Sequence, residues 1–177
     1  MTQRRVDAAT VTKAQFQDRV DFLESEGPLW QARMGLDHIE IEHHYLDASS
    51  ALLFGAGVKN SPGTVRCAYG RGGGQATFTA FVETRWNYQM ADVYFMLPSV
   101  IQWEESRLEA VLVHEYAHIL CAAEQYLLEY KLEEVAAEEA MTTTDMEALG
   151  GLYYERMEMA TENVARAVLR SFAAGGR

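Results

Sequence analysis

Residues 111–120 read Val-Leu-Val-His-Glu-Tyr-Ala-His-Ile-Leu, and this strongly apolar run contains two histidines four residues apart. On an α-helix, residues four apart lie one above the other on the same face, so the imidazoles of His114 and His118 can converge on one metal ion. Glu115 is rotated by about 100° around the helix axis from His114. The run therefore predicts a helix that presents two metal ligands beside a carboxylate.

A His-Glu-x-x-His set is expected by chance only about 0.015 times in a chain of this composition. Two buried histidines can also be structural, each hydrogen-bonded to a carbonyl group. Burial of two imidazoles and a carboxylate costs several kcal/mol unless a metal or hydrogen bonds compensate. We therefore expect Zn²⁺ as the cofactor, His114 and His118 as ligands, and Glu115 as the general base that takes a proton from the attacking water.

A hydrolytic zinc site needs a third protein ligand and keeps its fourth position for water. Two groups of glutamates follow the motif: Glu133, Glu134, Glu138 and Glu139, then Glu155, Glu158 and Glu162. Glu138 lies near the separation found in thermolysin-like enzymes, and Glu139 points to an apolar stripe. Glu158 lies close to the apolar stripe of the last helix, whereas Glu155 and Glu162 are expected to point further out. The residues alone leave the choice between Glu158, Glu138 and Glu139 open, and each is also compatible with a solvated helix face.

The segments around the motif predict an α+β fold. Apolar spacing predicts a helix from Thr10 to Glu26 that stops at Gly27-Pro28, followed by a short helical turn ending at Gly35. Alternating and β-branched runs then predict three or four strands of a mostly antiparallel sheet, within residues 39–45, 64–69, 76–83 and 88–97. Residues 60–63 and 70–74 have the composition of tight turns.

The second half of the chain is expected to be helical. One helix starts near Glu104 and passes through His118, and another starts at residues 142–145 and reaches Phe172, with a break at Gly150-Gly151. No repeat or linker divides the sequence, so residues 1–177 are predicted to form a single domain. Strand 88–97, which precedes the metal helix, is expected to be the sheet edge that takes up an extended peptide by β-addition.

Charge and composition restrict the partners. The formal charge of −11 disfavours nucleic acid, and no apolar stretch reaches the roughly 20 residues of a membrane span. The N-terminus lacks the apolar region of a secretory signal, and two cysteines fit a reducing compartment. We expect a cytoplasmic protein that acts on a peptide or protein substrate, with no membrane partner. The oligomeric state is not predicted.

Two further groups of residues have both a functional and a structural interpretation. Cys121 lies on the same helical stripe as His114 and His118, where a thiolate can bind metal, although a cysteine in an apolar helix is commonly a small core residue. His38, Glu40, Glu42 and His44 alternate along one strand, where they form either a second cation site or a solvent-facing surface.

The sequence resembles the small zincin-type metallopeptidases encoded by bacteriophages and prophages. Four stretches carry the resemblance and together span most of the chain: residues 30–41, 86–97, 112–120 and 158–169. Only the metal motif among them is specific. The resemblance implies a sheet between an N-terminal helix and the metal helix, and a zinc-dependent hydrolase that cleaves a peptide bond.

In that family, a glutamate shortly before a Leu-Ala-Arg-Ala-like run on the last helix completes the site. The run at residues 164–168, Val-Ala-Arg-Ala-Val, matches it, so the resemblance implies Glu158 as the third ligand. This sequence departs from the family by a long acidic segment, residues 124–141, directly after the motif, which keeps Glu138 in competition. The alternative to an enzyme is a phage structural or host-interaction protein on a zincin scaffold, with a non-catalytic metal site.

Overall fold

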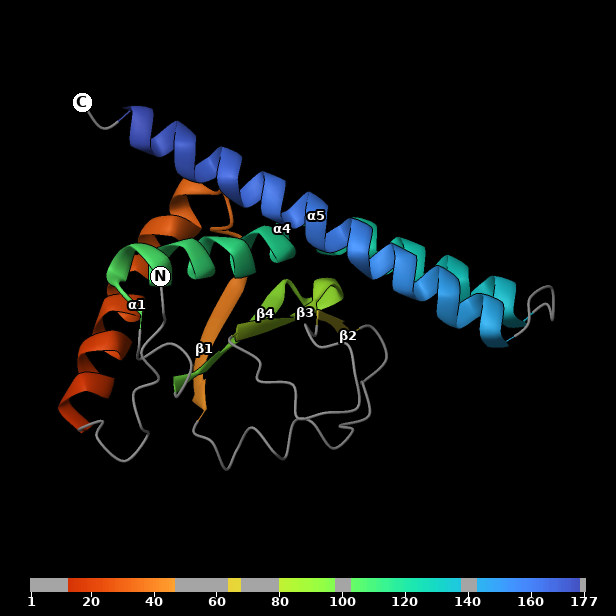
Figure 1. The fold of residues 1–177 in the computed structure, drawn as a ribbon, viewed down its shortest axis with the longest axis horizontal. Helices are drawn as coiled ribbons and strands as arrows, with labels where there is room; N and C mark the ends of the chain where they lie inside the picture. The colour runs from red at the N-terminus through yellow and green to blue at the C-terminus, as the bar shows by residue number, and fades with distance from the viewer. Residues whose placement is uncertain (1–12, 47–63, 68–79, 98–102, 138–142, 176–177) are drawn as a thin grey trace, which may run out of the picture.

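The computed structural model describes residues 13–46, 64–67, 80–97, 103–137 and 143–175. Its elements, in chain order, are α1 (Lys13–Arg33), β1 (Glu40–Leu46), β2 (Thr64–Cys67), β3 (Ala80–Arg85), the short 3-10 helix η2 (Trp86–Tyr88), β4 (Met90–Met96), α4 (Glu105–Ala137) and α5 (Thr143–Gly175). Figure 1 shows α4 lying between the sheet and α5, with α1 beside them. The predicted α+β class is confirmed: an N-terminal helix, a small sheet, then helices.

The sheet has the strand order β1-β4-β3-β2. β4 is antiparallel to β3 and parallel to β1, and β2 is antiparallel to β3, so the sheet is mostly antiparallel, as predicted. The prediction that strand 88–97 forms the sheet edge is wrong, because β4 has a hydrogen-bonded neighbour on each side. Val93 and Phe95 of β4 are fully buried, and this apolar character suits the interior of the sheet.

One face of the sheet packs against α4 and supplies much of the core. The strand residues on this face include Ile41, Val82, Ala91, Val93 and Phe95, and the helices add Leu23, Trp30, Leu108, Leu112, Val113, Ile119 and Ala165. α4 is therefore held by the sheet on one side and by α1 and α5 on others. None of the described helices combines the length and apolarity needed to cross a membrane.

The first helix does not end where the sequence predicts. Gly27 and Pro28 lie inside α1, which continues to Arg33. A proline within a helix removes one backbone hydrogen bond and costs about 3 kcal/mol. Leu23 and Trp30 are both buried, on either side of the proline, and the Trp30 indole also donates a hydrogen bond to Glu109 of α4 at 3.1 Å. Packing of both halves against the core offsets the cost and keeps the helix whole.

The end of α1 and the course of α5 show two different roles of glycine. Gly35 has a φ of 69° and follows the last turn of α1, as expected for a helix stop. Gly150 and Gly151, by contrast, do not break the last helix, which runs without interruption from Thr143 to Gly175. A helical glycine costs about 1 kcal/mol relative to alanine, which is small beside the packing of α5 along α4.

A buried imidazole joins α1, β1 and α4. His43 Nε2 lies 3.0 Å from the Tyr116 hydroxyl of α4, and its Nδ1 lies 3.8 Å from Glu24 of α1. The hydroxyl of Tyr45 donates to the same Glu24 carboxylate at 2.6 Å. α1 passes so close that a Cβ at Gly27 would lie 2.7 Å from the His43 ring, so only glycine fits there. These contacts connect α1 and α4 to β1 and so help to set how the two helices lie on the sheet.

Stability should fall on acidification because of His43. Burial, aided by His44 and opposed by Glu24, lowers the pKa of His43 below its usual 6.5. The unfolded chain therefore binds the proton first, and the contribution of neutral His43 is complete above pH 6.5 and lost as the pH falls through the folded-state pKa. We expect His43→Gln to reduce the pH dependence of the free energy of unfolding by up to about 1.4 kcal/mol per pH unit in this window. Urea unfolding between pH 5 and 8 measures it.

His38→Gln serves as the control, because His38 is exposed and precedes the strand. Equal pH slopes of the free energy of unfolding for wild type and His43→Gln would contradict the assignment of this pH dependence to His43.

The predicted turns at residues 60–63 and 70–74 lie outside the described residues.

Candidate metal centre

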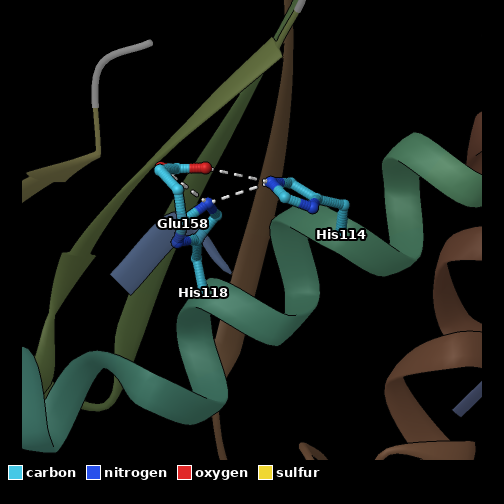
Figure 2. A group of neighbouring side chains, drawn as sticks. All are labelled: His114, His118 and Glu158. Carbon is cyan, nitrogen blue, oxygen red and sulfur yellow. Dashed lines mark hydrogen bonds and ion pairs between the residues drawn. The ribbon is translucent and has the colours of Figure 1, made fainter. Parts of the chain in front are cut away.

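His114, His118 and Glu158 form the principal cluster of metal-ligating side chains among the described residues. Figure 2 shows the two imidazoles projecting from consecutive turns of α4 and the carboxylate reaching them from α5. The two Nε2 atoms lie 3.2 Å apart. Glu158 Oε1 is 3.4 Å from Nε2 of His118, and Oε2 is 3.5 Å from Nε2 of His114. The two imidazole nitrogens and the two oxygens of one carboxylate thus lie close together, each nitrogen facing a different oxygen.

The separations between these nitrogen and oxygen atoms match those between ligands of tetrahedral zinc. With bonds of roughly 2.0–2.1 Å, two ligands of a tetrahedral ion are separated by about 3.3–3.4 Å. The observed separations of 3.2, 3.4 and 3.5 Å fall around that value. Two imidazoles and one carboxylate are also a donor set that zinc takes in hydrolytic sites, with one position left over. The residues present therefore fit a zinc ion.

The surroundings of the Glu158 carboxylate also favour a bound cation. Its Oε2 atom is buried and finds no hydrogen-bond partner among the described residues. A buried carboxylate oxygen without a partner is costly, and a cation would remove that cost. Burial would raise the pKa of Glu158, but the imidazoles of His114 and His118 outweigh it and hold the pKa at about 2. Glu158 is therefore ionised at neutral pH, as a ligand must be.

A second layer of contacts comes from the next turn of α5. Glu162 Oε2 accepts a hydrogen bond from His114 Nδ1 at 3.1 Å, while its Oε1 accepts one from Arg166 at 2.6 Å. The hydroxyl of Thr161 lies 3.3 Å from Nδ1 of His118. Partners of this kind orient ligating imidazoles. The sequence interpretation missed Thr161 and considered Glu162 only as an outward-pointing candidate ligand, although their spacing from Glu158, three and four positions, places them on the same helix face.

Glu155 and Glu162 were expected to point further out than Glu158. Glu155 is exposed, and the Glu162 side chain is 43% exposed against 20% for Glu158. The aliphatic part of Glu162 nevertheless places its carboxylate on His114. Glu162 therefore contacts a residue of the cluster even though its position on the helix points outward.

Glu115 lies within the electrostatic reach of the cluster. Its side chain is buried, and burial raises the pKa of its carboxyl, an effect that the positive potential of His118 and His114 opposes and the charge of Glu158 reinforces. A carboxyl group whose pKa lies above the usual value is a stronger base once ionised. The arrangement suits a group that takes up a proton and gives it away.

The other candidate ligands whose side chains are described lie outside the cluster of His114, His118 and Glu158. Glu134 is exposed and pairs with Lys131 at 2.6 Å. Cys121 is half-buried and does not belong to the cluster of His114, His118 and Glu158. Glu138 and Glu139 lie outside the described residues, and nothing is shown of the Glu133 side chain. Of the glutamates whose side chains are described, Glu158 is the one whose carboxylate joins both histidines.

The strand surface at β1 contains a second group, formed by Glu42, His44 and Asp92. His44 Nε2 lies 2.8 Å from Oδ1 of Asp92, and Arg85 pairs with the other carboxylate oxygen of Asp92. The guanidinium already balances the charge of this buried aspartate, so the contacts account for the group without an ion. His38 and Glu40, the other members of the alternating set, are exposed.

The stretches that carry the resemblance to phage zincins fall on the elements around the site: the end of α1 and start of β1, β4, the middle of α4 and the second half of α5. Comparison of the sequence with models of protein families, with curated proteins and with solved structures found no match. The functional interpretation therefore depends on the geometry of the site itself.

Proposed function

We propose that the protein is a zinc-dependent hydrolase that cleaves a peptide bond. The observation that carries the proposal is the cluster of His114, His118 and Glu158, whose nitrogen–nitrogen and nitrogen–oxygen separations of 3.2–3.5 Å suit ligands of one tetrahedral ion. Three protein ligands leave one position for water or substrate, whereas structural zinc sites use four. A set of three ligands among the described residues favours catalysis over a structural role.

Each residue has a separate task in this proposal. His114, His118 and Glu158 hold the ion, and Glu162 and Thr161 orient the imidazoles. Bound zinc would lower the pKa of a water molecule and polarise the carbonyl of the scissile bond. Glu115 takes the proton from the attacking water and delivers it to the leaving nitrogen. Burial of Glu115 keeps bulk water from competing for that proton.

Purified, untagged protein should bind about one equivalent of zinc and lose it to a strong chelator. Elemental analysis after zinc supplementation and gel filtration measures the stoichiometry. The zinc-loaded protein is then assayed on quenched fluorescent peptide libraries, with the chelated protein as the control. Absence of bound zinc would contradict the metal centre. Bound zinc without turnover of any peptide would contradict the enzymatic proposal and favour a non-catalytic metal site.

A further inference from the structure

The two imidazoles of the metal centre differ in the groups that hold their Nδ1 atoms. His114 Nδ1 meets a carboxylate, Glu162, at 3.1 Å, whereas His118 Nδ1 meets the hydroxyl of Thr161 at 3.3 Å. An ionised carboxylate only accepts hydrogen bonds, but a hydroxyl group donates as well as accepts. Neutral His114 must therefore carry its proton on Nδ1, while the partner of His118 permits either tautomer.

The contact between the rings selects the tautomer of His118 in the metal-free protein. Because His114 is protonated on Nδ1, its Nε2 presents a lone pair. The two Nε2 atoms lie 3.2 Å apart, so His118 must donate from Nε2. Its Nδ1 is then an acceptor and receives the Thr161 hydroxyl proton. Donation thus runs in one direction, from Thr161 through His118 and His114 to Glu162.

The partnerless oxygen of Glu158 agrees with this direction. Its Oε2 lies 3.5 Å from His114 Nε2 yet has no hydrogen-bond partner among the described residues. In this arrangement His114 Nε2 presents its lone pair to the carboxylate oxygen at 3.5 Å, the outer limit of a hydrogen bond. His114 Nε2 and Glu158 Oε2 are then two hydrogen-bond acceptors that face each other in a partly buried site. Such a pair is unfavourable alone and is stabilised by a cation.

Metal binding requires lone pairs on both Nε2 atoms. His118 must then move its proton to Nδ1, and the group at Nδ1 must change from donor to acceptor. We propose that Thr161 is a positioning residue whose hydroxyl reverses its hydrogen bond, so that His118 changes tautomer when zinc binds and stays oriented in both states. Thr161 is fully buried and His118 is 3% exposed, so bulk solvent does not replace this contact. The inference rests on the proposed function in taking zinc as the ion.

The test compares Thr161→Val, which keeps the shape and removes the hydroxyl, with Thr161→Ser, which keeps the hydroxyl. Nitrogen-15 NMR of the imidazoles, at alkaline pH where both are neutral, reports the tautomers without and with zinc. Wild-type His118 should carry its proton on Nε2 in the metal-free protein and on Nδ1 in the zinc form. Competition with a chromophoric chelator should show a loss of zinc affinity of roughly 10–100-fold for Thr161→Val and little change for Thr161→Ser.

Wild-type spectra with the proton on Nδ1 of His118 before zinc is added would overturn the proposal, even if Thr161→Val failed to fold. Wild-type affinity in a folded Thr161→Val variant would overturn it as well. In both cases zinc binding by the wild-type protein, and with it the proposed function, would stand. Failure of the wild-type protein to bind zinc would instead refute the metal centre before any variant is compared.

Discussion

Glu115→Gln should retain zinc and lose peptide hydrolysis by roughly 10²–10⁴-fold, the usual contribution of a general base. The amide keeps the size of the side chain and cannot accept the proton of the attacking water. Because Glu115 is buried, its neutral replacement also avoids the desolvation of a charge, so the fold should be retained. Zinc content by elemental analysis and kcat/KM on the best library peptide are measured on the same preparation.

Glu124→Gln is the matched control, since it makes the same change at an exposed position of the same helix. It should leave zinc content and turnover unchanged. Stoichiometric loss of zinc from Glu115→Gln would make Glu115 a ligand and its assignment as base wrong. Retained turnover would mean that another group takes the proton.

Glu158→Ala should empty the metal centre. The substitution leaves two imidazoles as ligands, so the loss of zinc affinity should exceed the roughly 10–100-fold expected for an orienting partner such as Glu162. The pKa of His114 supports the reading, because it is raised mainly through the Glu158 and Glu115 carboxylates, which outweigh the lowering effect of burial. Competition against a chromophoric chelator measures the affinity, and circular dichroism verifies that the variant folds.

Glu155→Ala controls for removal of a carboxylate from an exposed position of α5. Glu138→Ala and Glu139→Ala are measured beside it, because the sequence left both open as the third ligand. Near wild-type affinity in Glu158→Ala, with a collapse in either of the other two, would transfer the ligand to the acidic segment after the motif.

The middle of α4 is an example of a feature that can be predicted from the sequence. Its two histidines and its apolar flanks obey one local rule, the helical repeat, and the structure places both imidazoles on one side of α4. The helix–sheet–helix order is similarly local, since each element shows its own periodicity. The four strands overlap the predicted runs for the same reason, although β1 and β3 extend one and two residues beyond them.

The predictions that failed concern features that depend on contacts between residues far apart in the sequence. Nothing near Pro28 indicates that Trp30 will anchor α1 to Glu109, which is 79 positions away. The interior position of β4 depends on its pairing with β1, a strand that lies 50 positions earlier in the sequence. The role of Glu162 depends on how α5 crosses α4, because the same side chain on a free helix would simply be solvated. Sequence patterns predict which face of a helix or strand is apolar. Tertiary contacts determine which other element packs against that face.

The parallel pairing of β1 with β4 sets the order in which the chain can fold. Each pair in this register, such as Ile41 with Ala91, is separated by 50 positions in sequence. At roughly 5–20 residues per second, a ribosome needs several seconds to supply the partner strand. Such long-range pairing also slows refolding compared with the local contacts between β3 and β4. During synthesis β1 therefore emerges well before its partner strand, and His114, His118 and Glu158 emerge later still.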